Sequence, residues 1–238
     1  MKRIVASLAV AWMAFAGPLS AQESGGPVVV ELFTSQGCSS CPPADLLLQK
    51  LTGREDVLPL ALHVDYWDYI GWKDTFADPF FTLRQKGYAR AAGRRMIYTP
   101  QIVVMGQDDV VGADAMELAD LIMAQLRRPK QVEISARRGK AGSVAVRLRP
   151  VATVAGAYDV QLVRYTPIEH VRIARGENAG KNIDYVNVVD GWQLLGRWDG
   201  TSEANFQSPL EEDDDRPGAV LVQQAGFGPI IGAARVTR

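Results

Sequence analysis

Residues 28–43 read VVVELFTSQGCSSCPP, and this stretch decides the fold that we predict for the first half of the chain. The near-continuous apolar run over residues 28–33 is typical of a strand buried in a parallel or mixed sheet. A polar turn leads into Cys38 and Cys41, after which apolar residues recur at helical spacing through residue 51. The cysteine pair therefore lies between the end of a strand and the N-terminus of a helix, where a thiolate is stabilised.

The chain has two cysteines, both within Cys38-Ser39-Ser40-Cys41, so neither can pair with a third cysteine of the same chain. They can form a disulfide with each other, pair with another protein, or hold a metal. Residues three apart on a helical turn lie about 5–6 Å from each other, which suits a disulfide. The loop that it would close is too short for the bond to add much stability. A redox-active pair is therefore favoured over a structural disulfide or a metal site.

The double proline Pro42-Pro43 complicates the helix start. A proline disfavours helical geometry at the residue before it. We therefore expect Cys41 to leave the helical conformation, the helix to begin later, and Ser40 to be a candidate N-cap. We also expect Cys38, which is nearer the strand-end loop, to be more exposed than Cys41.

The rest of the first half continues to alternate strands and helices. After the first strand and helix we predict a strand over residues 57–64, a helix capped by Asp78-Pro79, a strand over residues 101–105, a short strand near residue 110, and a helix from about residue 115. The predicted order is β-α-β-α-β-β-α. We assign residues 22–128 to this α/β domain.

From about residue 130 the hydrophobic period changes from helical to alternating. Many short strands separated by turns are typical of a sandwich or barrel. We therefore predict an all-β, sandwich-like domain over residues 129–238. The boundary is the basic, proline-containing stretch at residues 127–130.

The N-terminal residues predict an export signal. Lys2 and Arg3 precede an uncharged apolar run over residues 4–16, and the small residues Ser20-Ala21 follow. This layout is typical of a secretory signal peptide over residues 1–21, cleaved after Ala21. The run is shorter than the ~20 residues needed to span a bilayer. We expect a periplasmic or secreted protein with no transmembrane segment after cleavage, in a compartment that oxidises thiols; an uncleaved anchor is the alternative.

Composition narrows the classes of function. Apolar residues make up 47% of the chain and charged residues 22%, which excludes a disordered chain. The net charge of −1, from 26 basic and 27 acidic residues, argues against nucleic-acid binding through a broad basic surface. The two histidines exclude a multi-histidine metal cage.

The predicted order of elements, with a CxxC after the first strand and a Thr-Pro before the third, resembles the thioredoxin fold. In that superfamily the proline at this place is cis and faces the cysteines, which implies the same for Pro100. Longer patterns resemble one exported bacterial family, catalogued as "domain of unknown function 1223". They cover residues 31–45, 63–68, 98–101, 175–180 and 198–200. The resemblance spans most of the mature chain, and the family has no established reaction.

The leading functional hypothesis is an exported thiol-disulfide oxidoreductase. Cys38 would be the nucleophile and Cys41 would resolve the mixed disulfide. The resemblance implies that Pro100 shapes the substrate groove. We expect no cofactor, and as partners we expect protein thiols or disulfides and a redox partner protein.

Two alternatives remain open. The first is a metal-binding or chaperone module that holds copper through Cys38, Cys41 and His63, because soft thiolates suit copper(I). The second is a non-enzymatic binding protein on a thioredoxin scaffold, because a fold alone does not fix an activity.

Four further features are candidates near the site or away from it. His63 could shuttle protons or bind metal, but a hydrogen-bonded histidine at a strand end is favoured. Asp65 could accept a proton from Cys41, a role that a buried carboxylate has in thioredoxins. The polar, glycine-bearing segment 175–180 could reach over the site, although a simple hairpin turn is favoured. His170 is expected to face solvent.

Overall fold

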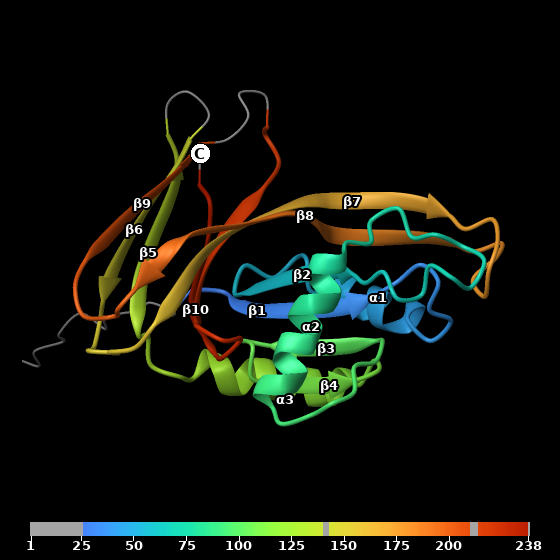
Figure 1. Ribbon diagram of the computed structural model, residues 1–238, viewed down its shortest axis with the longest axis horizontal. Coiled ribbons are helices and arrows are strands. Elements are labelled where there is room, and N and C mark those ends of the chain that lie inside the picture. Colours follow the sequence, from blue (N-terminus) through green and yellow to red (C-terminus); the bar gives the residue numbers. More distant parts are fainter. Residues whose placement is uncertain (1–25, 140–142, 210–213, 238) are drawn as a thin grey trace, which may run out of the picture.

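A computed structural model describes residues 26–139, 143–209 and 214–237 (Figure 1). The predicted signal peptide, residues 1–21, lies outside the described residues. Within the described ranges, no helix combines the length and the apolar character that crossing a bilayer requires.

The elements of the first half follow the predicted order. They are β1 (Val28–Thr34), α1 (Pro42–Gln49), β2 (Val57–His63), α2 (Pro79–Ala91), β3 (Gln101–Val104), β4 (Asp108–Val111) and α3 (Ala115–Leu126). The predicted cap of α2 is present, because the Asp78 side chain accepts a hydrogen bond from the Phe80 backbone N–H.

The strand β1 is central to this half. It pairs in parallel with β2 over its whole length and antiparallel with β3. All seven of its residues are buried because both faces of the sheet are covered. Residues of α1 and α3 pack in one core with Val30 and Leu32, and residues of α2 pack in another with Val29 and Phe33. The apolar run over residues 28–33 is therefore explained by the helices that cover both faces of this strand.

The described residues of the second half form strands and no helix. They are β5 (Val132–Arg138), β6 (Ser143–Pro150), β7 (Tyr158–Arg172), β8 (Asn182–Trp198), β9 (Ala204–Pro209), β10 (Gly218–Gln224) and β11 (Ile230–Arg235). Strands β5, β6 and β9 form a three-stranded antiparallel sheet. Its apolar face packs against residues of β7, β8 and β10 in a third core.

One eight-stranded mixed sheet joins the two halves. Its strand order is β11-β10-β7-β8-β2-β1-β3-β4, so it crosses the boundary predicted at residues 127–130. The chain is thus a mixed α/β fold with a large mixed sheet and a smaller antiparallel one. The junction is a parallel contact between β8 and β2 at Val188 and Ala61. Next to it, Asn187 has a left-handed backbone (φ 46°), and its side chain donates to the Pro59 carbonyl.

The β7–β8 hairpin is much longer than the sequence predicted. The sequence predicted only short strands in this half, whereas β7 runs from Tyr158 to Arg172 and its pairing with β8 continues through two register shifts. Figure 1 shows this hairpin extending from the three-stranded sheet to the end of the molecule where α1 lies. It therefore brings residues of the second half to the cysteine loop.

The buried face of α2 differs from a simple apolar stripe. Phe80 and Leu83, which share a face at helical spacing, are exposed, whereas Arg84 is almost completely buried. The Arg84 guanidinium donates to Glu31 of β1 (2.7 Å) and to Gln223 of β10 (3.0 Å). A paired, buried charge thus occupies the place that an apolar side chain would fill. Its hydrogen bonds connect β1 of the first half with β10 of the second.

Candidate functional site

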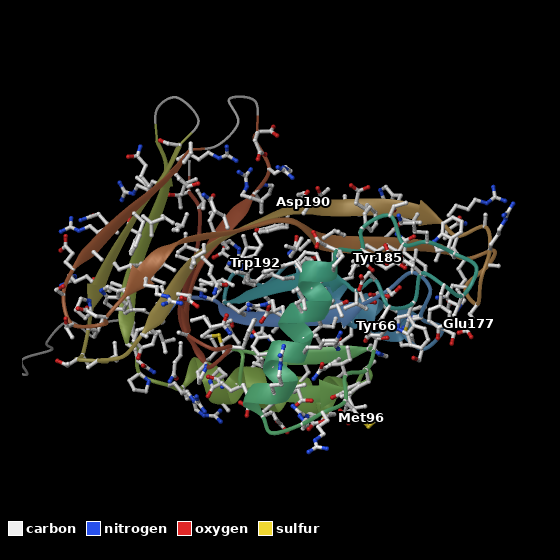
Figure 2. All side chains as sticks on the ribbon, in the orientation of Figure 1. Tyr66, Met96, Glu177, Tyr185, Asp190 and Trp192 are labelled. Atoms are coloured by element: carbon white, nitrogen blue, oxygen red, sulfur yellow. A yellow bond between two sulfur atoms is a disulfide. The ribbon has the colours of Figure 1, made fainter. Side chains whose placement is uncertain are left out.

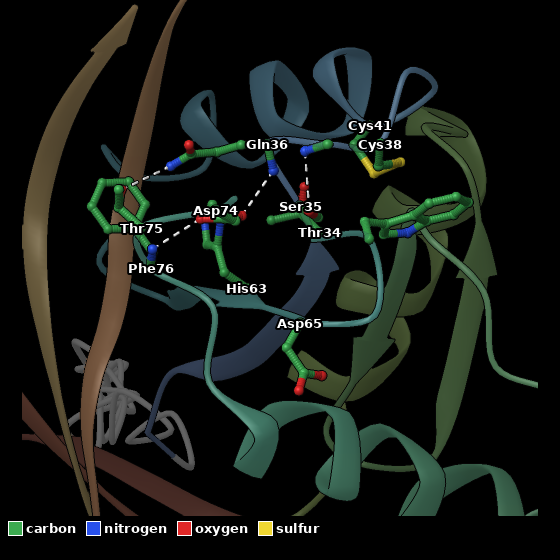
Figure 3. Close-up of polar contacts among 12 residues, drawn as sticks. Thr34, Ser35, Gln36, Cys38, Cys41, His63, Asp65, Asp74, Thr75 and Phe76 are labelled. Atoms are coloured by element: carbon green, nitrogen blue, oxygen red, sulfur yellow. Dashed lines mark hydrogen bonds and ion pairs between the residues drawn. A yellow bond between two sulfur atoms is a disulfide. The ribbon is translucent and has the colours of Figure 1, made fainter. Parts of the chain in front are cut away.

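Cys38 and Cys41 are bonded to each other in a disulfide, with their Cα atoms 5.4 Å apart. This is one of the three arrangements that the sequence left open. The pair occupies the turn between β1 and α1, and the Cys41 backbone N–H donates to the Cys38 carbonyl (3.2 Å). Figure 3 shows the disulfide above the end of β1.

The helix α1 begins directly after the disulfide, so the expected delay of its start is wrong. Cys41 itself is the N-cap and has helical backbone angles (φ −77°, ψ −35°). Pro42 and Pro43 occupy the first two positions, where a backbone N–H has no helical partner in any case. The Cys41 carbonyl accepts from the N–H groups of Ala44 and Asp45, which holds the first turn together. Ser40 makes no cap.

The peptide bond between Thr99 and Pro100 is cis, as the resemblance implies. The Thr99 carbonyl accepts a long hydrogen bond from the Ser40 hydroxyl (3.5 Å), so the proline loop contacts the cysteine turn. The Thr99 hydroxyl accepts from the indole N–H of Trp67 (2.7 Å). The proline loop, the cysteine turn and the aromatic segment that follows β2 (residues 66–72, YWDYIGW) thus lie together.

Both cysteines are buried, at 2% exposure for Cys38 and 0% for Cys41. The expected difference in exposure between them is therefore absent. Gly37 shows how closely the turn is covered, since a Cβ added there would lie 3.2 Å from the Trp67 Cβ.

Asn178 is a site residue that the sequence did not reveal. It belongs to the segment 175–180, which turns the β7–β8 hairpin and also reaches the cysteine turn. The buried Asn178 amide donates to the carbonyls of Gln36 (2.9 Å) and Cys38 (2.8 Å), and its oxygen accepts from Lys181 (2.7 Å). The sequence of a glycine-bearing turn does not indicate that its asparagine binds Cys38, which lies 140 residues earlier in the chain.

The hairpin tip packs closely on the aromatic segment. Gly176 has a positive φ of 77°, and a Cβ added there would lie 3.1 Å from the Trp72 Cβ. The Trp72 indole in turn donates to the Gln36 side chain (2.7 Å). Figure 2 shows Glu177 at this tip, at the same end of the molecule as Tyr66. The second half therefore forms part of the cover over the disulfide.

His63 ends β2 and is hydrogen-bonded, the interpretation that the sequence favoured. Its Nδ1 lies 2.7 Å from Oδ2 of Asp74, and both side chains are fully buried. The same Asp74 oxygen accepts from the Gln36 backbone N–H (2.8 Å), as Figure 3 shows. Burial acts to raise the pKa of the Asp74 carboxyl, but His63 and backbone N–H donors outweigh it and lower that pKa.

The proposed copper ligands are not brought together. His63 uses Nδ1 for Asp74. Among the residues that the structure describes, no three or more His, Cys, Asp and Glu side chains are arranged to hold a metal ion.

Asp65 does not approach Cys41, so its assignment as proton acceptor is wrong. Its carboxylate accepts from the Thr82 hydroxyl of α2 (2.5 Å), and Figure 3 shows it apart from the sulfur atoms. β2 ends at His63, so the strand alternation no longer orients a side chain two residues later.

Asp45, in the first turn of α1, is a second buried carboxylate beside the cysteine turn. Its backbone N–H donates to the Cys41 carbonyl (3.1 Å), and its Oδ1 accepts from the Thr34 hydroxyl (2.8 Å). Burial raises the pKa of this carboxyl to about 7, although His63 and Thr34 both act to lower it. The sequence signal for Asp45 is its spacing of four residues from Cys41, which places the two side chains on one helix face.

Comparisons with known proteins cover the whole site. A family model described as "Protein of unknown function (DUF1223)" matches residues 29–223. The chain is also similar to a crystal structure of a protein from Agrobacterium tumefaciens, with 36% identity and a TM-score of 0.77. That similarity covers 91% of this chain and 96% of the other. No curated protein matches the sequence. The matched range includes both the cysteine turn and the hairpin tip that contacts it.

Proposed function

The chain belongs to the family described as Protein of unknown function (DUF1223), and we propose that it is an exported thiol–disulfide oxidoreductase with a thioredoxin-like first half. The observation that carries the proposal is the Cys38–Cys41 disulfide at the N-terminus of α1, beside the cis Thr99–Pro100 bond. A helix N-terminus stabilises a thiolate, which is the form that leaves when a disulfide is reduced.

The exchange is a pair of displacements in which the protein's disulfide oxidises a substrate dithiol. One substrate thiolate attacks the Cys38 sulfur and displaces Cys41 as a thiolate, which gives a mixed disulfide. The second substrate thiolate attacks the substrate sulfur of that bond and displaces Cys38. The substrate leaves as a disulfide, and the protein keeps two electrons and, once both sulfurs are protonated, two protons. A redox partner protein with a disulfide of its own restores the oxidised pair.

Because Cys38 is buried, the exchange requires that its sulfur atom first become accessible. A sulfur atom reacts only where a partner thiolate can reach it. The aromatic segment and the hairpin tip cover the turn, so a protein substrate has to displace part of that cover. Two side chains hold this cover against the turn, because Asn178 donates to the Cys38 carbonyl and Trp67 lies against Gly37.

A glutathione redox titration of the mature protein tests the proposal. The fraction of reduced pair is measured by alkylation and mass spectrometry across buffers of different potential. We expect reversible, two-electron exchange, and we expect Cys41→Ser to trap mixed disulfides with other exported proteins while Cys38→Ser traps few. A wild-type pair that neither accepts nor donates electrons, together with the absence of any trapped adduct, would leave the disulfide as a structural bond.

Export is tested separately by N-terminal sequencing of the protein taken from its native envelope. The Lys2-Arg3 start and the apolar run that follows predict a mature chain that begins at Gln22. Recovery of the intact Met1 chain from the cytosol would remove export from the proposal.

A further inference from the structure

A cavity of about 260 Å³ lies where the two halves of the chain meet. Its walls come from the start of β1, the turn between β3 and β4, the C-terminal end of α3, and the turn between β10 and β11. Figure 1 shows that last turn beside α3. The cysteine turn follows the other end of β1 and contributes no residue to the lining. Small molecules bind preferentially at such junctions, so this cavity is a candidate site separate from the disulfide.

The charged side chains that line the cavity are both cations, namely Arg128 and Lys130. No described residue of the lining is acidic. Its other polar side chains are the amides of Gln107, Gln125, Gln131 and Gln224. Guanidinium, ammonium and amide groups all supply N–H donors. The sign of the charge and the supply of donors therefore favour an anionic ligand.

Gln107 orients the guanidinium of Arg128. The Nη1 atom of Arg128 donates to the side-chain oxygen of Gln107 (3.1 Å), which joins the segment after α3 to the turn between β3 and β4. This is the one side-chain hydrogen bond that Arg128 makes to the described residues. The remaining N–H groups of its planar fork can bind both oxygens of a carboxylate, which is the pairing that a guanidinium makes best.

Two negative groups oppose an anion at this wall. Asp108 does not line the cavity, but its carboxylate accepts a hydrogen bond from the buried Gln125 amide, which does (3.2 Å). The carbonyls at the C-terminal end of α3 carry about half an elementary negative charge. The full positive charges of Arg128 and Lys130 together exceed these two contributions, so the wall retains a positive balance.

The rest of the lining is mostly apolar. Val28 and Ile230 are buried, while Leu126, Met105 and Ile231 are half-buried. Met105 adds an unbranched, adaptable side chain. Its backbone is left-handed (φ 48°), a conformation that is uncommon for a residue other than glycine and that recurs at binding sites. These walls suit a ligand with an apolar body next to its charge better than a fully hydrated inorganic ion.

We propose that this cavity binds a small organic carboxylate with an apolar body, of about the size of an aromatic acid. Arg128 binds the carboxylate, Gln107 orients the guanidinium, and the apolar walls contact the body of the ligand. The volume is slightly below the roughly 300–1,000 Å³ of typical ligand pockets, which limits the ligand to a small molecule. The inference is independent of the oxidoreductase proposal, because the lining contains no residue of the cysteine turn.

Isothermal titration calorimetry of the mature protein at neutral pH tests the site with three probes. Benzoate has both the charge and the ring, benzamide keeps the ring without the charge, and acetate keeps the charge without the ring. We expect saturable binding of benzoate, and affinities about tenfold lower or less for benzamide and for acetate. Equal affinity for benzoate and benzamide would overturn the carboxylate, and equal affinity for benzoate and acetate would overturn the apolar body.

Two neighbouring arginines provide a matched pair of variants. Arg128→Gln removes the guanidinium from the lining, and we expect it to weaken benzoate binding about tenfold while benzamide binding stays unchanged. Arg127→Gln removes the same charge from an exposed residue outside the lining, and it should bind benzoate as the wild type does. Equal losses in the two variants would show that only the overall charge matters and that Arg128 does not bind the carboxylate.

Methionine methyl NMR locates the binding without any substitution. Met105 lines the cavity, whereas Met96, Met116 and Met123 are exposed and do not line it. Benzoate should shift the Met105 signal with the affinity measured by calorimetry and leave the other three signals in place. The absence of saturable binding, or binding that does not shift Met105, would overturn the site. Neither measurement involves the disulfide, so such a failure would leave the oxidoreductase proposal unchanged.

Discussion

Two buried polar clusters lie on opposite faces of the central strand β1. On the α2 face, Glu31, Arg84, Tyr88 and Gln223 hydrogen-bond to one another, and none of their buried side-chain atoms lacks a partner among the described residues. On the α1 face, Asp45, His63 and Tyr185 each have one buried polar atom with no hydrogen-bond partner among the described residues. A fully paired network fixes structure. An incompletely paired network does not, and the two clusters should therefore respond differently to substitution.

The largest loss of unfolding free energy is expected when a substitution breaks the paired cluster. Arg84→Met leaves the carboxylate of Glu31 buried without its cation, and removing one partner of a buried pair costs about 3–5 kcal/mol of unfolding free energy. Urea unfolding measures the loss. The double variant Glu31→Gln/Arg84→Met should lose less than Arg84→Met alone, because no buried charge remains. A single variant as stable as the wild type would show that the α2 cluster does not hold the halves together.

The unpaired cluster should instead change how the free energy of unfolding depends on pH. Asp45 has a pKa of about 7 in the folded chain and 3.8 as its ordinary value. Between these values the folded state holds a proton that the unfolded state has lost, so the contribution of Asp45 is full below 3.8 and is lost as the pH rises through about 7. The wild type should lose up to about 4 kcal/mol over this window relative to Asp45→Asn, at about 1.4 kcal/mol per unit. Urea unfolding at several pH values measures it, and a wild type with the same slope as Asp45→Asn would contradict the assignment.

The cover over the disulfide provides a third comparison. Asn178→Ala removes three hydrogen bonds, two that the amide donates and one that it accepts from Lys181, and leaves the carbonyls of Gln36 and Cys38 without that donor. We expect a loss of about 1–3 kcal/mol of unfolding free energy, together with faster reduction of the disulfide by dithiothreitol. Asn178→Asp, which keeps the acceptor for Lys181 but cannot donate, should behave like the alanine variant. A loss of stability with no change in the reduction rate would show that Asn178 does not restrict access to Cys38.

The smallest change in unfolding free energy is expected when one tyrosine from each cluster is replaced. The Tyr88 hydroxyl donates to Glu31 and accepts from Arg84 and Gln223, whereas the buried Tyr185 hydroxyl has no partner in the part of the chain that the structure describes. Tyr185→Phe removes an unpaired polar group and should raise the unfolding free energy by about 0.5–1 kcal/mol, while Tyr88→Phe should lower it by about 1 kcal/mol or more. Thermal unfolding of both variants measures the difference. Equal losses would mean that the two hydroxyls have equivalent surroundings.

The local parts of the site follow from the sequence. The strand before the cysteines, the helix after them and the Asp78 cap of α2 depend on neighbouring residues, and the structure contains all three. The cis bond before Pro100 followed from resemblance alone.

The parts that depend on distant contacts could not be predicted. Asn178 reaches back 140 residues to Cys38, and nothing in a glycine-bearing turn specifies that partner. Asp45 resembles an acidic residue in a first helical turn, which ordinarily faces solvent and favours the helix dipole. Arg84 occupies a buried position that a hydrophobic stripe would assign to an apolar side chain, because its partner Glu31 lies on another element.

The order in which the chain is synthesised determines when the long β7–β8 hairpin can cover the cysteines. The two cysteines are three residues apart and can be oxidised as soon as that segment emerges. The strand that pairs beside β2 and the amide that covers the Cys38 carbonyl come more than a hundred residues later. Until then β2 is an edge strand with unpaired backbone groups, a surface that invites association with other chains. There is consequently an interval during biogenesis when the sulfur atoms are open to oxidants and catalysts, and completion of the hairpin closes it.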